Sequence, residues 1–93
     1  SHGWDLTSRN DPEEPWPLER WGWPWEHVVT GNTPERFGDL VYAAREFLGT
    51  CRRDSDNVLV LNAWNEWTEG SVLAPTVDEG DAVLRALQAS LTR

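Results

Sequence analysis

The feature that most constrains this chain is a short, mostly apolar segment at residues 58–63, which reads Val-Leu-Val-Leu-Asn-Ala. Apolar side chains occupy both alternating faces of the run, which is typical of a strand buried within a parallel sheet. Such a strand needs a neighbouring strand on each side and a covering layer on each face. A chain of 93 residues supplies too little of either. We therefore expect a piece of a larger α/β protein or, alternatively, a small domain completed by oligomerisation.

Helices are predicted on both sides of this strand. Over residues 33–49, Thr33 is a suitable N-cap, Pro34 suits the first helical position and Gly49 suits the end. Apolar residues recur there at helical spacing, namely Phe37, Leu40, Val41, Ala44, Phe47 and Leu48. A second helix is predicted over residues 79–92, with inward positions Val83, Leu84, Leu87 and Leu91. The alternation of strand and helix indicates a parallel α/β fold, the last two βα units, about a quarter, of a (β/α)8 barrel.

The first third, residues 1–32, has no sustained periodicity and carries prolines at positions 12, 15, 17 and 24. We expect a short strand around residues 3–5, followed by a long irregular loop. Tryptophans within this loop argue against simple disorder, because disordered segments are poor in aromatic residues. They either line sugar subsites or pack the loop onto a barrel rim; the loop residues concerned are Trp16, Trp21, Trp23 and Trp25.

Charge and composition exclude several classes of partner. The 16 acidic residues outnumber the 8 basic ones, all of them Arg, so no basic stripe is expected to bind nucleic acid or an anionic membrane. The longest apolar run has four residues, which predicts no transmembrane helix. A single cysteine excludes an internal disulfide framework, and His27 has no partners at metal-ligand spacing. We expect no metal and no cofactor.

The predicted site loop, residues 64–78, follows the carboxyl end of the apolar strand, where α/β proteins build active sites. Glu66 and Glu69 lie three residues apart in it. Paired carboxylates are what glycosidic-bond chemistry requires, one as proton donor and one as base or nucleophile. Neighbouring side chains could pack against sugar faces or bind sugar hydroxyls, namely Trp64, Trp67, Asn62 and Asn65. The alternative is that the acids are solvated loop residues and the tryptophans fill a core.

Three residues near the start of the chain complete the candidate set. Trp4 is a candidate for sugar binding, and Asp5 and Arg9 could hold a sugar hydroxyl or orient a glutamate. The alternative for Asp5 and Arg9 is a structural ion pair.

Residues 62–75, read as Asn-Ala-Trp-Asn-Glu-Trp-x-Glu-Gly followed by Leu-x-Pro, resemble the "NxWNEWxEGxxLxP" signature of the WbsX-like family of glycosyltransferases. That family is related to family 99 glycoside hydrolases, which are endo-α-mannosidases and endo-α-mannanases. Residues 3–9 are similar to the family's "GWDxTxR" stretch, and residues 33–37 match the start of the helix between the two motifs. The resemblance covers nearly the whole chain.

The resemblance implies a (β/α)8 barrel, of which this chain is the seventh and eighth strand–helix units. It implies that Glu69 is the general acid and base at the leaving oxygen of an α-mannosidic bond. Glu66 would then remove the proton of the sugar 2-hydroxyl, which attacks the anomeric carbon with overall retention. Thr68 stands where family 99 commonly has His, and Ala74 where WbsX-like proteins usually have Glu, so the sugar stays open.

The sequence thus predicts the C-terminal fragment of a carbohydrate-active enzyme, a retaining glycoside hydrolase for α-linked, mannose-like glycans. The alternatives are a glycosyltransferase of polysaccharide biosynthesis and a non-catalytic carbohydrate-binding or structural module. The 93-residue chain by itself is expected to be inactive and to self-associate through an exposed sheet edge.

Overall fold

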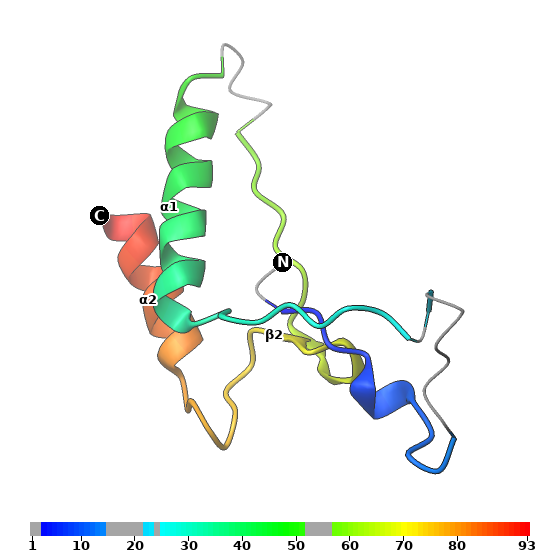
Figure 1. The fold of residues 1–93 in the computed structure, drawn as a ribbon. Coiled ribbons are helices and arrows are strands. Elements are labelled where there is room, and N and C mark those ends of the chain that lie inside the picture. The colour runs from blue at the N-terminus through cyan, green and yellow to red at the C-terminus, as the bar shows by residue number, and fades with distance from the viewer. Residues whose placement is uncertain (1–2, 15–21, 24, 52–56) are drawn as a thin grey trace.

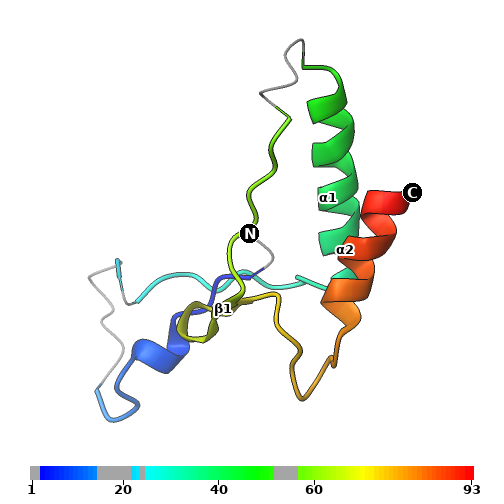
Figure 2. The ribbon, with the colours of Figure 1, turned by 180° about the vertical axis from the view of Figure 1, so that it is seen from behind.

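The computed structural model describes residues 3–14, 22–23, 25–51 and 57–93. Its elements, in chain order, are the 3-10 turn η1 (Thr7–Arg9), helix α1 (Pro34–Gly49), strand β1 (Asn65–Glu66), the 3-10 turn η3 (Trp67–Glu69), strand β2 (Ser71–Val72) and helix α2 (Ala82–Thr92). The two helices pack side by side, while the β1–β2 hairpin lies beside η1 (Figures 1 and 2). The Cα radius of gyration is 16.3 Å, above the roughly 12 Å of a compact domain of this length.

Helix α1 coincides with the helix expected over residues 33–49, because its end signals are local. The Thr33 hydroxyl accepts a hydrogen bond from the Arg36 amide (3.3 Å), and Pro34 occupies the first helical position. Helix α2 begins at Ala82, three residues later than predicted. The Thr76 and Gly80 backbones bond each other both ways at 3.0 and 2.9 Å, and this turn delays the helix.

A small core joins the helices to the hairpin. It consists of Phe37, Val41, Leu73 and Val83, with Leu61 and Leu87 packed against it. The buried Ser90 hydroxyl shares its one hydrogen between the carbonyl of Ala86 on its own helix (2.6 Å) and that of Gly38 on α1 (2.8 Å), and the second contact joins the helices. Three residues of the apolar faces predicted for these helices are instead exposed, namely Leu40, Phe47 and Leu91.

Residues 58–63 pair with no described strand in this structure, so the strand predicted there stays a prediction. They run alongside α1 (Figures 1 and 2), and residues 59–62 line a cavity of about 190 Å³ with it. Val60 is 85% exposed. The backbone of residues 58–62 makes no hydrogen bond with the backbone of any described segment. A strand is defined by such pairing. The barrel predicted around this segment stays a prediction.

The other two predicted segments also differ in detail. The strand expected around residues 3–5 is a single antiparallel bridge, in which the Val29 amide donates to the Trp4 carbonyl (2.9 Å). The loop expected over residues 64–78 contains an antiparallel hairpin, with Asn65 opposite Val72 and Glu66 opposite Ser71. Two-residue strands are too short to produce a periodic pattern, so they could not be predicted from the sequence. In the described part of the chain, no helix is long and apolar enough to cross a membrane.

Candidate active site

The β1–β2 hairpin sets the spacing of the two glutamates. Glu66 ends β1, and Glu69 ends the 3-10 turn η3. Residues three apart in such a turn lie on the same side, so the two carboxylates are brought to one face. Gly70 then reverses the chain into β2 with φ of +64°, a conformation that glycine adopts without strain.

Arg9 links the two carboxylates. Its Nη2 atom lies 3.3 Å from Glu66 Oε1 and 3.5 Å from Glu69 Oε1. The structure therefore brings Arg9, a candidate from the start of the chain, to the predicted pair of glutamates. The glutamate side chains are 43% and 24% exposed, respectively, so both remain accessible to a ligand.

Thr68 completes this ion cluster and was missed as a site residue by the sequence reasoning. Its hydroxyl accepts hydrogen bonds from Arg9 Nε (2.9 Å) and Nη2 (2.7 Å) and donates to Glu66 Oε1 (3.1 Å). The Ser8 hydroxyl donates to the Thr68 carbonyl at 3.1 Å. The only signal in the sequence was that Thr68 replaces a histidine of family 99, and this gave no hint of a contact with Arg9.

A short N-terminal turn delivers Arg9 to the hairpin. The Asp5 carboxylate accepts a hydrogen bond from the Thr7 amide (2.9 Å) and so holds the start of η1. Hydrogen bonds from the Thr7 hydroxyl and amide lower the pKa of Asp5 below its usual 3.8. The Asp5 amide donates to the Glu69 carbonyl at 2.8 Å, and Leu6 is buried at 2% exposure. The Asp5 carboxylate is thus used in the turn, and its binding of a sugar stays a prediction.

Two glycines allow this N-terminal segment to touch the hairpin. A Cβ added at Gly3 would overlap the Gly70 carbonyl oxygen and lie 3.1 Å from its carbon. A Cβ added at Gly70 would lie 3.2 Å from the Asp5 Cβ. The backbones of residues 3–5 and 69–70 are therefore packed as closely as glycine permits.

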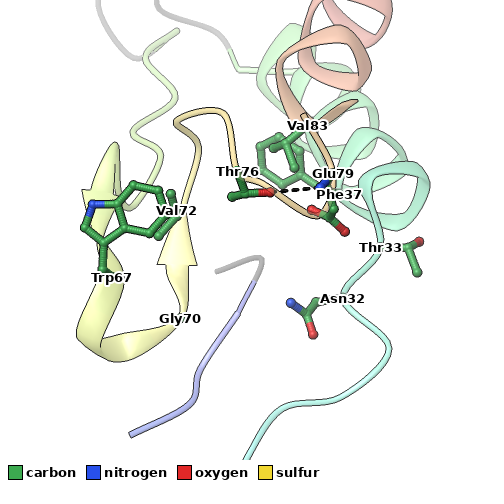
Figure 3. A pocket seen from close by; sticks show the side chains of 9 residues that line it. All are labelled: Asn32, Thr33, Phe37, Trp67, Gly70, Val72, Thr76, Glu79 and Val83. Carbon is green, nitrogen blue, oxygen red and sulfur yellow. Dashed lines mark hydrogen bonds between the residues drawn. The ribbon is translucent and has the colours of Figure 1, made fainter. Parts of the chain in front are cut away.

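Trp67 lines a different space from the glutamates. A cavity of about 220 Å³ lies between the hairpin and the first turns of α1 and α2, and Figure 3 shows the side chains that line it. It is lined by Asn32, Thr33, Phe37, Trp67, Gly70, Val72, Thr76, Glu79 and Val83. Glu66 and Glu69 do not line it. Trp64 is exposed, and its carbonyl accepts hydrogen bonds from Leu73 (3.1 Å) and Ala74 (2.9 Å).

The remaining candidates lie apart from the carboxylates or serve the hairpin. Asn62 Nδ2 donates to the buried Ser71 hydroxyl (3.1 Å) and so fixes the base of the hairpin. Asn65 is exposed on β1. The Trp4 indole donates to Glu26 Oε2 (3.0 Å) and lines a separate cavity with Trp25. Trp16 and Trp21 lie outside the described residues.

Trp23, left undecided by the sequence, is brought to the ion cluster. The Arg9 Cζ atom lies 5.5 Å from the centroid of the Trp23 ring, within the range of a cation–π contact. No signal in the sequence distinguishes Trp23, because several other tryptophans lie close by in the same loop.

The arrangement is suited to chemistry on hydroxyl groups. Two carboxyl groups face one guanidinium at an accessible surface. Such a surface can accept hydrogen bonds from hydroxyls and stabilise positive charge developing on a sugar ring. Among the described residues, no group of His, Cys, Asp or Glu side chains could hold a metal ion.

Comparison with known proteins connects this site to a family. The model of the family "Glycosyltransferase WbsX" matches residues 19–87, a stretch that contains both glutamates and begins after Arg9. Two relatives, each named "Uncharacterized protein WxcX" and from two strains of Xanthomonas campestris pv. campestris, are 34% identical over 61 residues. The match covers 66% of this chain but only 9% of each relative. No solved structure matches. The chain belongs to the WbsX glycosyltransferase family.

Proposed function

We propose that this chain carries the catalytic carboxylates of a retaining glycoside hydrolase that acts on α-linked, mannose-like glycans. The observation that carries the proposal is the pair Glu66 and Glu69, held within 3.5 Å of one guanidinium nitrogen. Membership of a carbohydrate-related family supports a glycan as the substrate. The relatives are much longer than the matched stretch, so the activity proposed is that of the full-length protein.

In the proposed reaction, Glu69 donates a proton to the leaving glycosidic oxygen. Glu66 removes the proton of the sugar 2-hydroxyl, whose oxygen attacks the anomeric carbon and closes a 1,2-anhydro ring. Water then opens this ring, with Glu69 accepting a proton from the water and Glu66 returning one to the 2-oxygen. Arg9 and Thr68 contact only Oε1 of Glu66 within the described chain, which leaves Oε2 open to substrate.

Arg9 suits this scheme as a positioning residue. Arginine is preorganised to hold carboxylates in a fixed geometry, and Arg9 is itself fixed by two hydrogen bonds to Thr68. It thereby fixes the distance between the acid and the base. Proton transfer by positioned groups contributes about 10²–10⁴-fold to a rate, so this distance matters for turnover.

A glycosyltransferase is the second candidate, and the name of the family favours it. The reaction would differ in transferring the sugar from an activated donor to a hydroxyl of an acceptor. Release of nucleotide from a nucleotide sugar would then replace the appearance of reducing ends. A non-catalytic carbohydrate-binding module is the third candidate, and it would bind glycan without either product.

We further propose that residues 58–63 form a strand of a (β/α)8 barrel completed by the rest of the full-length protein. The apolar character of both faces and the exposure of Val58 and Val60 support this. Hydrogen exchange on the full-length protein tests it, since the amides of residues 58–62 should be protected by pairing with neighbouring strands. The isolated chain, with this edge uncovered, is expected to self-associate and to be inactive.

The proposed function is tested with Glu69→Gln and Glu66→Gln in the full-length protein. Soluble α-mannan is supplied as substrate, and GDP-mannose with mannan as acceptor serves the transferase assay. Each substitution should lower the release of reducing ends by about 10²-fold or more. Glu46→Gln, an exposed carboxyl on α1, is the matched control and should leave the rate unchanged.

The outcomes separate the candidates. Full turnover in the Glu69→Gln variant would overturn the catalytic assignment. Release of GDP without new reducing ends would favour the transferase. Binding of mannan with neither product would favour a binding module.

A further inference from the structure

The tryptophan beside the ion cluster has a mostly free ring. Trp23 is 59% exposed, whereas the buried anchor of the same region, Leu6, is 2% exposed. Arg9 contacts this ring and also both glutamates, so a single side chain connects the indole to the carboxylate pair. An exposed indole contributes little to folding, but it offers a flat apolar surface to a ligand.

We propose that Trp23 is the aromatic wall of a sugar subsite at the Glu66–Glu69 pair, stacking on the apolar C–H face of a pyranose ring. A pyranose has an apolar face and a rim of hydroxyls. The indole would take the face, while the free carboxylate oxygens would accept the hydroxyls. This inference rests on the proposed function, because it names the group that binds the same glycan.

The other tryptophans in the described chain have different surroundings, which singles out Trp23. Trp67 lines the cavity in Figure 3, and Trp4 and Trp25 line another. Trp64 is as exposed as Trp23, so the contact with Arg9 is what distinguishes the two. Among the described residues, Trp23 is the only tryptophan with a ring contact to Arg9. The guanidinium stabilises the position of the ring without covering it, as its exposure shows.

Binding to soluble α-mannan tests the proposal. The full-length protein carries Glu69→Gln, so that the glycan is bound but not turned over, and 5-fluorotryptophan, so that each indole gives a ¹⁹F resonance. Trp23→Phe identifies the Trp23 signal by its loss. That signal should shift on addition of mannan, and Trp23→Ala should weaken binding about tenfold, while Trp23→Phe retains most of the affinity.

Phe47→Ala is the matched control, because Phe47 is an exposed aromatic residue on α1. It should bind mannan like the parent. Parent-like affinity in Trp23→Ala, or a Trp23 signal that does not move, would overturn the subsite, as would a failure of the parent to bind mannan. The proposed function is tested by a separate measurement, the glycan turnover of the variant that carries only Glu69→Gln. Full turnover in that variant would overturn the proposed function. A Trp23→Ala variant with a lowered melting temperature is replaced by Trp23→Leu, which keeps apolar bulk but lacks a ring.

Discussion

Replacing Gly3 with alanine should disable the site without touching a catalytic group. The added Cβ would overlap the Gly70 carbonyl oxygen and approach its carbon to 3.1 Å. Both are backbone atoms, so no flexible side chain can move aside. The N-terminal segment must therefore shift away from the hairpin by about 1.4 Å to restore ordinary van der Waals contact.

That shift acts directly on the ion cluster. It would stretch the 2.8 Å hydrogen bond from the Asp5 amide to the Glu69 carbonyl and move Arg9 relative to both glutamates. A misplacement of about 1 Å costs roughly 10²-fold in rate, and the strain should destabilise the fold by about 1–3 kcal/mol. We expect kcat/KM on soluble α-mannan to fall about a hundredfold in Gly3→Ala.

The assay compares turnover and melting temperature of the full-length protein with those of Gly49→Ala. Nothing lies within 4 Å of a Cβ at Gly49, so this control should keep full turnover, with a stability gain of up to about 1 kcal/mol. Wild-type turnover and melting temperature in Gly3→Ala would contradict this prediction, since the two backbones could then separate without cost to the site.

Three further changes follow from other contacts. Ser90→Ala removes the hydroxyl that bridges α1 and α2 and should lower the free energy of unfolding by about 1 kcal/mol in thermal melts; an unchanged melting temperature contradicts this. Arg9→Lys keeps the charge but loses the fork that meets Thr68 and both glutamates, so kcat should fall about tenfold or more at an unchanged fold; wild-type kcat would argue against a positioning role. Because the pKa of Asp5 is lowered below 3.8, its turn contributes stability that is present above pH 3.8 and lost as the pH falls through the lower, folded-state value. Acid unfolding should therefore be less steep in that range for Asp5→Asn, and curves identical to wild type would count against it.

The helices could be predicted because their signals are local. Thr33, Pro34 and the apolar stripe after them specify α1 without reference to the rest of the chain. The run at 58–63 is different. Its apolar pattern indicates burial between two layers. The described chain supplies only α1, on one side of the segment, so the pairing that would make it a strand is absent there.

The site divides in the same way. Glu66 and Glu69 were found because the motif places them three residues apart, close to where the chain turns. The role of Thr68 could not be read, since its partner Arg9 is 59 residues away. Which tryptophan of the loop contacts Arg9 could not be predicted, because only the folded loop distinguishes Trp23 from its neighbouring tryptophans.

The distance along the chain between Arg9 and the glutamates also limits how this protein can be recombined. The hairpin carries both acids within a few residues, but the cation that spaces them arrives from a segment 57 residues earlier. A chimaera that exchanges only residues 62–75 would receive both glutamates. The cation that positions them would then have to come from the host protein. Residues 3–9 and the hairpin therefore have to be exchanged together, and active recombinants should be those that take both from the same parent.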